Sequence, residues 1–224
     1  NQVVNQDLLD NGILFIMDTE GNSLISWDII HKEDIVIIPA FGVSLEILKI
    51  LKNKNINTEE YNTTCPFVAK VWNRSEEIAR KGYTNIIHGK FNHEETRSTF
   101  SRTRKYGHSL IVENIEDVKK LCLYIENKRE KKLFKEDFRY KFTNKFNVDK
   151  HLIKIGVVNQ TTMLASETKE IIAMLTDSFI KKYGSDNITD HIANTRDTLC
   201  YATNENQEST IKLLEKNADI TIVA

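Results

Sequence analysis

The chain has 224 residues, of which 40% are hydrophobic and 28% charged, and this balance is ordinary for a globular protein. Its formal net charge of −1 gives no indication of a nucleic-acid or membrane partner, and no apolar run approaches the roughly 18 residues that a transmembrane helix needs. Three scattered cysteines are too few for a disulfide framework and favour a reducing compartment.

Short apolar runs alternate along the chain with segments of helical periodicity. The runs predict strands, in chain order, at 13–17, 35–38, 84–88, 109–112, 153–158, 191–194 and 219–223. The periodic segments predict helices at 44–53, 66–80, 115–126, 166–183 and 204–216. Ser44 and Asn114 are expected N-caps, Pro66 occupies a first helical position, and Gly184 ends the longest helix. This alternation predicts βαβ units and an α/β fold with mainly parallel sheets.

The segment 127–150 interrupts the alternation with a dense run of charged residues. Within it, phenylalanine recurs every four residues, at Phe134, Phe138, Phe142 and Phe146. This spacing predicts an amphipathic helix that packs its phenylalanines on the domain and exposes its charges. A basic and aromatic surface for nucleic acid would use the same residue types, but we favour the packing helix.

Polar side chains follow several predicted strands at the points where the strands end. In open α/β sheets, ligands bind outside the carboxyl ends of the strands. Thiol, imidazole, carboxylate, amide and hydroxyl groups stand in four such segments, at 63–66, 88–96, 159–163 and 200–203. Their convergence predicts a functional site at this edge of the sheet.

Two of the cysteines stand at equivalent corners of the predicted fold. Cys65 and Cys200 each precede a helix, whose N-terminal dipole favours the thiolate that binds metal. A single cysteine is more often a buried apolar residue, but two at equivalent corners favour metal ligation. Cys122 falls on the apolar face of the helix predicted over 115–126, and we interpret it as a core residue.

His93 and Glu95 lie two residues apart in a turn that opens a helix. The helix dipole alone favours a carboxylate in a first turn, and a histidine there can cap the helix or face solvent. His88 closes an apolar strand, and we interpret it as a structural histidine. The residues by themselves therefore leave a structural and a functional role open for His93 and Glu95.

Four motifs, in this order, resemble the 4-hydroxy-3-methylbut-2-enyl diphosphate reductase family, which acts last in the non-mevalonate isoprenoid pathway. They are TTCPFVAKVWN at 63–73, HGK and HEET within 88–96, NQTTM at 159–163, and CYAT at 200–203 followed by Gln207. The resemblance covers essentially the whole chain. The sequence PAFG at 39–42, Asn159 and the 127–150 segment are similar to the plant and cyanobacterial branch.

The resemblance implies a 4Fe-4S cluster held by three cysteines, with one iron open to the substrate hydroxyl as a Lewis acid. Cys65 and Cys200 match the second and third ligands, and the first is expected upstream of Asn1. The implied fold is a trefoil-like arrangement of three similar α/β units around the cluster. The chain would hold a partial first unit at 1–62, a second at 63–196 with the inserted helix near 127–150, and the start of a third at 197–224. We therefore expect a fragment that is inactive by itself, with a labile or absent cluster.

The resemblance also implies roles for the remaining residues of the site. Glu95 matches the carboxylate that relays a proton so that the hydroxyl leaves as water, and Thr161 matches the hydroxyl that bonds to the substrate and to that carboxylate. His93 matches a histidine that reaches the diphosphate, where an imidazolium would donate a charge-assisted hydrogen bond. Gln160 and Thr162 are assigned to substrate binding beside Thr161. Many bacterial relatives have a diphosphate-binding histidine at the position of Phe41, so one donor is missing here.

The implied reaction reduces 4-hydroxy-3-methylbut-2-enyl diphosphate to isopentenyl and dimethylallyl diphosphate with two electrons from a donor such as ferredoxin or flavodoxin. We expect a plastid, a plastid-derived organelle or the bacterial cytoplasm as its location, and no nucleic-acid or membrane partner. A non-catalytic module that binds an anionic metabolite at the same corners is the alternative hypothesis. A thiol enzyme with a Cys–His pair is a third, although no such pair is close in sequence.

Overall fold

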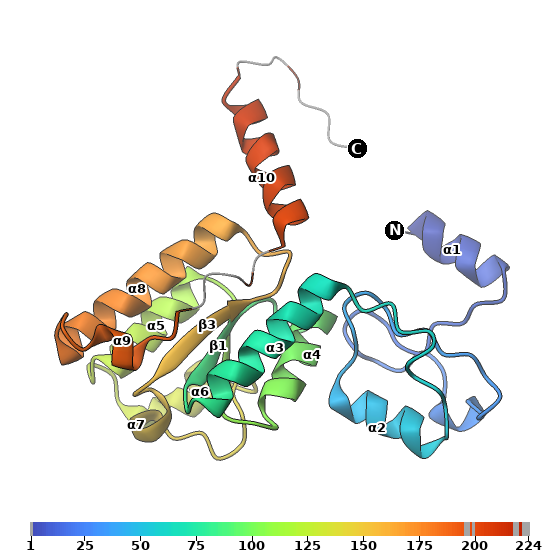
Figure 1. The fold of residues 1–224 in the computed structure, drawn as a ribbon, viewed down its shortest axis with the longest axis horizontal. Helices are drawn as coiled ribbons and strands as arrows, with labels where there is room; N and C mark the ends of the chain where they lie inside the picture. The colour runs from blue at the N-terminus through green and yellow to red at the C-terminus, as the bar shows by residue number, and fades with distance from the viewer. Residues whose placement is uncertain (1, 195–197, 199, 217–219, 221–224) are drawn as a thin grey trace.

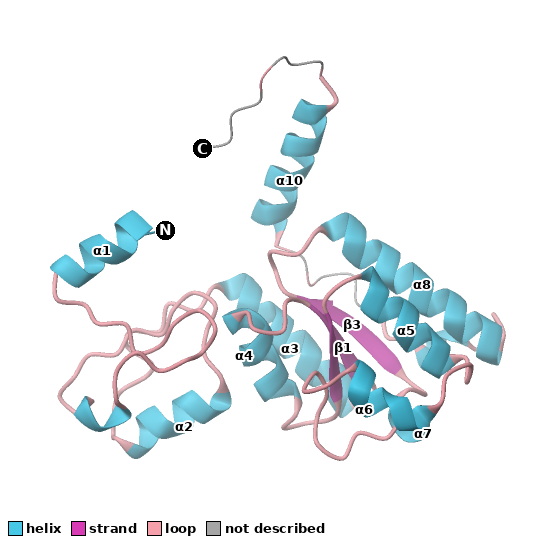
Figure 2. Ribbon diagram, turned by 180° about the vertical axis from the view of Figure 1, so that it is seen from behind, coloured by secondary structure: helices cyan, strands magenta, loops and turns pink. Residues whose placement is uncertain are grey.

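The computed structural model describes residues 2–194, 198, 200–216 and 220, and Figures 1 and 2 show their arrangement. The elements in chain order are α1 (Gln2–Asp10), η1 (Trp27–Ile29), α2 (Leu45–Asn53), α3 (Pro66–Arg80), β1 (Thr84–His88), α4 (Glu94–Thr103), β2 (Ser109–Val112), α5 (Ile115–Ile125), η2 (Lys131–Leu133), α6 (Phe134–Asp137), α7 (Val148–His151), β3 (Ile155–Asn159), α8 (Ala165–Tyr183), α9 (Ile188–His191) and α10 (Tyr201–Leu214). None of the helices in these described parts has the length and hydropathy of a membrane-spanning helix.

A three-stranded parallel sheet in the order β2-β1-β3 forms the centre of the larger part of the molecule. Every residue of the three strands is buried, because helices cover both faces of the sheet. On one face, Ile86, Leu110 and Val157 pack in a core with α5 and α8. On the other face, Ile87 and its neighbours pack against α3 (Figure 2). The predicted α/β class with parallel pairing is therefore confirmed.

The local signals of capping and periodicity set most of the element boundaries. Helix α3 and strands β1 and β2 have the predicted bounds. Ser44 and Asn114 cap α2 and α5 by accepting hydrogen bonds from the backbone N–H groups three residues later. Gly184 follows α8 with a φ of +84°, a conformation that favours glycine.

The strands predicted at 13–17, 35–38 and 191–194 are wrong. Each segment contributes a single bridge: Met17 to Ser23, Ile38 to Asn62, and Ile192 to Ile155. An apolar run becomes a strand only where a neighbouring segment pairs along its length, and these segments have no such neighbour among the described residues. The chain also begins with the unpredicted α1 and forms α9 at Ile188–His191. Of the strand predicted at 219–223, all but Ile220 lies outside the described residues.

The single amphipathic helix predicted near 127–150 is also wrong. The segment forms only the short η2, α6 and α7, and its backbone takes positive φ values of 57°, 64° and 61° at Asn127, Tyr140 and Lys145, which a helix does not accommodate. Its phenylalanines nevertheless pack as the spacing suggested. Phe134 and Phe138 are buried, and Phe146 stacks on Phe134 with ring centroids 5.2 Å apart. Short helical turns and loops thus bury the apolar side chains of this segment, instead of one continuous helix.

Helix α4 lies between the sheet and a second, smaller core, which consists of Ile30, Val36, Ile38, Leu51 and Ile56. It faces both sides largely with buried hydroxyl groups instead of large apolar side chains. The Ser98 hydroxyl donates to the Phe41 carbonyl oxygen at 3.1 Å, and Leu45 N–H donates to the Ser101 hydroxyl oxygen at 2.9 Å. These two bonds attach the N-terminal part of the chain to α4.

His88 is a structural histidine at the end of β1. Its side chain is fully buried, Nδ1 lies 2.9 Å from the Thr168 hydroxyl oxygen, and Nε2 lies 3.6 Å from a carboxylate oxygen of Glu167. Burial lowers the pKa of His88 from 6.5 to about 4. The folded state therefore keeps the imidazole neutral at pH values where the unfolded state takes up a proton.

We expect the free energy of unfolding of the full-length protein to fall as the pH drops from 6.5 to 4, because protons bind preferentially to the unfolded chain across that window. The contribution of His88 is roughly 3 kcal/mol, at about 1.4 kcal/mol for each unit of pKa shift. Urea unfolding at pH 7 and pH 4 measures it. In His88→Asn, whose amide can still meet Thr168, the acid-induced loss should shrink by that amount. An unchanged loss in His88→Asn, or an equal reduction in the exposed His31→Asn, would contradict this assignment.

Candidate active site

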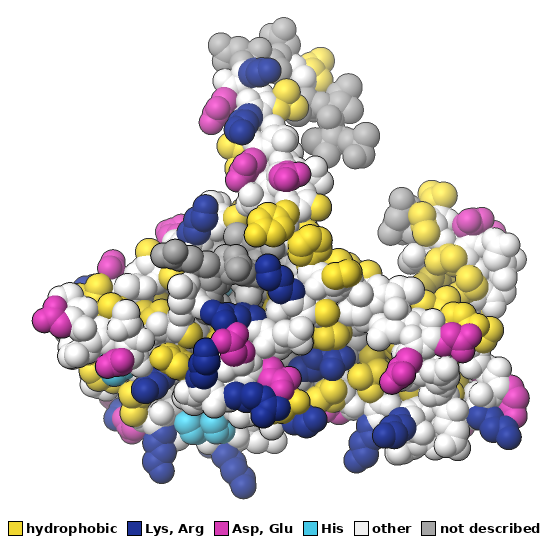
Figure 3. Space-filling model, viewed as in Figure 1, with side chains coloured by type: hydrophobic (Ala, Val, Ile, Leu, Met, Phe, Trp, Pro, Cys, Tyr) yellow, Lys and Arg dark blue, Asp and Glu magenta, His cyan; other side chains and the backbone are white. Residues whose placement is uncertain are grey.

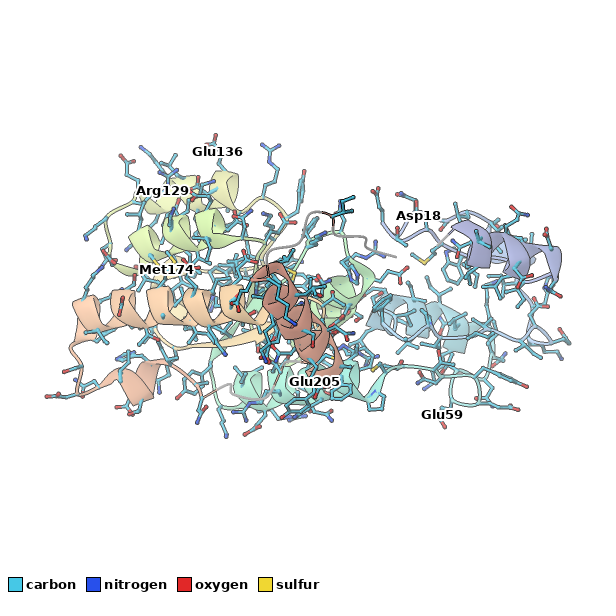
Figure 4. The ribbon with its side chains drawn as sticks, turned by 90° about the horizontal axis from the view of Figure 1, so that it is seen from above. Asp18, Glu59, Arg129, Glu136, Met174 and Glu205 are labelled. Atoms are coloured by element: carbon cyan, nitrogen blue, oxygen red, sulfur yellow. The ribbon has the colours of Figure 1, made fainter. Side chains whose placement is uncertain are left out.

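The predicted site residues collect at the carboxyl edge of the sheet. In register, His88 of β1 lies beside Asn159 of β3, so the segments that follow these two strands start side by side. Helix α4 begins in the first segment and α8 after the second. When the molecule is viewed from above, helix α10 lies across the centre of the view, between α8 and α3 (Figure 4).

The Glu95 carboxylate and Thr161 form the most completely bonded pair of the site. The backbone N–H of Thr161 donates to Oε1 of Glu95 at 2.6 Å, and the Thr161 hydroxyl donates to Oε2 at 2.8 Å. Both side chains are buried, and Glu95 has no measurable exposure. The structure thus brings together two residues that lie far apart in the sequence, as the resemblance predicted.

Burial raises the pKa of Glu95, and the two hydrogen bonds from Thr161 lower it by less. A carboxyl group in such surroundings takes up a proton at a higher pH than an exposed one. The geometry also decides which oxygen carries the proton. Because the Thr161 N–H always donates to Oε1, a proton on Glu95 belongs on Oε2, facing the Thr161 hydroxyl. The geometry therefore places any proton on Glu95 within hydrogen-bond distance of the Thr161 hydroxyl oxygen.

His93 is the N-cap of α4, and its Nδ1 accepts a hydrogen bond from the backbone N–H of Glu95 at 3.2 Å. This bond places the ring proton on Nε2. Burial, followed by the charges of Lys90 and Arg97, lowers the pKa of His93 and favours the neutral ring. The imidazolium expected from the sequence is therefore disfavoured in the absence of an anion. The ring of Phe41 packs edge-on against His93, with centroids 5.0 Å apart.

Gln160 connects the segments of the site to one another. Its amide oxygen accepts hydrogen bonds from Lys90 N–H at 3.0 Å and from the Thr96 hydroxyl at 3.1 Å. Its amide nitrogen donates to the Thr162 hydroxyl oxygen at 2.7 Å. Gln160 is buried, whereas Thr162 is exposed and can donate its own hydroxyl proton outward. The amide of Gln160 is thus largely occupied within the protein.

Gly89 is a site residue that sequence reasoning quoted but did not explain. A Cβ at this position would lie 2.5 Å from the Thr96 hydroxyl oxygen and 2.9 Å from Cβ of Gln160. Such distances are too short for any side chain, so the close approach of the loop to Gln160 requires glycine. The glycine of HGK, directly after a strand, was the signal that could have indicated this approach.

Cys65 and Cys200 are the N-cap residues of α3 and α10, and both thiols are free and half-buried. The two helix starts lie together, because the rings of Phe67 and Tyr201 are in edge contact at 6.2 Å and Lys70 stands 5.8 Å from the Tyr201 ring. Cys122 is buried in the core between α5 and α8, as predicted.

The two cap cysteines fit part of the ligand set of an iron–sulfur cluster. Thiolates are the preferred ligands of such clusters, and an N-terminal helix dipole favours the thiolate form. Both cysteines are free and half-buried at helix starts that contact each other. No group of three or more His, Cys, Asp or Glu side chains suited to a metal ion occurs among the residues that the structure describes. The chain thus offers two donors of the three that the resemblance implies.

Comparison with known proteins gives consistent matches over the whole chain. The family model described as LytB protein matches residues 1–224. A 4-hydroxy-3-methylbut-2-enyl diphosphate reductase of Gloeobacter violaceus is 38% identical over 225 residues, and one of Crocosphaera subtropica is 39% identical over 223 residues. Each alignment covers 100% of this chain but only 52% and 54% of the respective relative. The chain spans about half the length of the curated relatives it matches.

Two solved structures share the fold. The E-1-hydroxy-2-methyl-but-2-enyl-4-diphosphate reductase of Plasmodium falciparum superposes with a TM-score of 0.66 at 25% identity, over 96% of this chain and 53% of that one. A second reductase, described as the terminal enzyme of the non-mevalonate pathway, gives a TM-score of 0.62 at 23% identity, over 95% of this chain and 58% of that one. This chain therefore shares the α/β fold of the part of each protein that it covers.

Proposed function

The chain belongs to the LytB protein family, and from this premise we propose that the full-length protein is a 4-hydroxy-3-methylbut-2-enyl diphosphate reductase. The observation that carries the proposal is the buried Glu95–Thr161 pair, which stands at the same edge of the sheet as the two cap cysteines. A module that only binds an anion does not need a buried carboxyl group with a raised pKa.

The proposed reaction breaks the allylic C–O bond of the substrate. The hydroxyl group takes up one proton and leaves as water, while two electrons and a second proton enter the allylic skeleton to give isopentenyl or dimethylallyl diphosphate. When bound, a 4Fe-4S cluster with Cys65 and Cys200 among its ligands supplies electrons and a Lewis-acidic iron. Because this chain carries two of the three expected cysteines, we propose that it is inactive by itself.

Glu95 and Thr161 provide the proton that the leaving hydroxyl needs. With Glu95 protonated on Oε2, the carboxyl donates to the Thr161 hydroxyl oxygen, and the Thr161 proton is then free to point at the substrate oxygen. The Thr161 N–H holds Oε1 throughout, so the carboxyl group does not rotate as the proton moves. The pair therefore transfers a proton without rearranging the backbone.

The diphosphate of the substrate is proposed to meet His93 and Thr162. His93 offers its Nε2–H, and a bound anion would raise its pKa again and strengthen that bond. The exposed Thr162 offers its hydroxyl. The hydrogen bonds of Gln160 favour an indirect role, in which its side chain positions the loop of Lys90 and the hydroxyl of Thr162.

Family membership also supports the finer parts of the proposal. We propose the trefoil-like division into a partial first unit at 1–62, a second at 63–196 and the start of a third at 197–224. The two relatives reported above are cyanobacterial, which supports an electron donor such as ferredoxin or flavodoxin. It equally supports a plastid, a plastid-derived organelle or the bacterial cytoplasm as the location.

The proposed function is tested on full-length protein purified without oxygen. We expect a brown protein that contains iron and sulfide and converts the substrate to the two products when a chemical reductant and a carrier supply electrons. Product formation is measured by mass spectrometry, with oxygen-exposed protein as the control. A colourless protein without iron that binds the diphosphate and leaves it unchanged would contradict the reductase and favour the anion-binding module.

A further inference from the structure

Asn159 ends β3 with a fully buried side chain whose amide is bonded on both sides. Its nitrogen donates to the carbonyl oxygen of the next residue, Gln160, at 3.0 Å. Its oxygen accepts a hydrogen bond from the Thr198 hydroxyl at 2.6 Å. Since the nitrogen is committed to Gln160, the oxygen is held in the direction of Thr198.

Thr198 is 5% exposed and lies two residues before Cys200. We propose that Asn159 and Thr198 form a positioning pair that fixes Cys200 relative to the segment carrying Thr161. The inference rests on the proposed function only in taking Cys200 as a cluster ligand. Asn159 stands two residues before Thr161, so one buried hydrogen bond joins the proton-relay segment to the cysteine segment.

The other attachments of the cysteine segment are weaker. Helix α10 contains no buried residue, and it stands away from the body of the molecule (Figures 1 and 3). Gln207 exchanges two long hydrogen bonds of 3.4 Å with Ala165 N–H and the Met163 carbonyl oxygen. Tyr201 touches Phe67 but is 57% exposed. In the part of the segment that the structure describes, Thr198 thus makes the buried attachment nearest to Cys200.

A hydroxyl deletion at Thr198 provides the test. In Thr198→Val the side chain keeps its shape and loses the donor, whereas Thr198→Ser keeps the donor. We expect Cys200 in iron-free full-length protein to react with iodoacetamide about tenfold faster in Thr198→Val than in the wild type, the change expected for one hydrogen bond. Thr198→Ser should stay within about twofold of the wild type. Mass spectrometry of the modified peptides measures each cysteine separately.

Cys65 and Cys122 are internal controls in the same samples. An unchanged rate at Cys200 in Thr198→Val would overturn the proposal, and so would an equal rise at all three cysteines, because that would mean general loosening. In cluster-loaded protein, Thr198→Val should release iron to a chelator about tenfold faster, and an unchanged release rate would count against the pair. If the wild type never binds iron, the proposed function fails, while the alkylation rates still decide whether the pair positions Cys200.

Discussion

Replacing Glu95 with glutamine in the full-length protein should lower kcat by about 100- to 10,000-fold, the range expected for loss of a positioned general acid. Glutamine has the size of glutamate and can still accept the Thr161 N–H bond that now holds Oε1. Its amide has no acidic proton to transfer to the Thr161 hydroxyl, so the leaving group of the reaction is not protonated. Steady-state turnover with a chemical reductant measures the loss.

Glu94→Gln is the matched control, because Glu94 neighbours Glu95 on α4 and removing its charge changes the local electrostatics in a similar way. It should keep kcat within about threefold of the wild type, as expected for a residue outside the proton relay. Equal losses in both variants would assign the effect to charge near the site and contradict the relay.

The stability of Glu95→Gln separates catalysis from folding. Because burial raises the pKa of Glu95 above its ordinary 4.5, the unfolded state loses its proton at lower pH than the folded state, and stability falls as the pH rises through that window. The neutral glutamine is free of this penalty. Thermal unfolding at pH 8 should therefore show a Tm that is no lower than that of the wild type, even though turnover is lost.

The second large effect is expected at the cysteines. Cys65→Ser in the full-length protein should reduce bound iron from about four atoms per chain to less than about one, because a serine does not replace a thiolate ligand of a cluster. Serine is at the same time a preferred N-cap, so the start of α3 should be kept or strengthened. Cys200→Ser at the start of α10 should behave in the same way. Iron and sulfide analysis with visible absorption measures both.

Cys122→Ala is the control for the loss of a thiol. The Cys122 thiol donates a weak hydrogen bond to the Met174 carbonyl oxygen, at 3.7 Å, inside the core between α5 and α8. This variant should keep its iron and lose only a little stability. Full iron in Cys65→Ser and Cys200→Ser would remove these residues from the ligand set, and loss of iron in Cys122→Ala would show that the assay reports folding instead of ligation.

The parts of the fold that depend on local signals could be predicted from the sequence. Pro66 marks the first turn of α3, and the caps at Ser44 and Asn114 mark α2 and α5, because each acts within one turn of its own position. The segments at 13–17 and 35–38 could not be predicted in this way. Their apolar runs become strands only if other segments pair with them, and periodicity does not contain that information.

In the candidate site, too, residues that belong to local motifs could be predicted, whereas contacts that depend on the tertiary fold alone could not. The motifs predicted His93, Glu95 and Thr161 as residues of one site. The contact between Glu95 and Thr161 joins the first turn of α4 to the loop after β3, and the parallel pairing of β1 and β3 brings these segments side by side. The hydrogen bond from Thr198 to Asn159 was not predicted, because neither residue type nor spacing distinguishes it from any surface threonine and asparagine. The helix predicted over the long charged segment was wrong for another reason: between the regularly spaced phenylalanines, Tyr140 and Lys145 take positive φ values that interrupt a helix.

The hydroxyl-lined surface of α4 has a consequence for the proposed proton relay. The helix that begins with Glu95 is also the element to which Phe41 and Leu45 are attached through Ser98 and Ser101. Because Ser98 and Ser101 follow Glu95 on the same helix, these bonds connect the packing of the N-terminal part to the element that positions the Glu95 carboxyl group. We therefore expect the proposed proton relay to depend on the packing of a region that contributes none of its atoms.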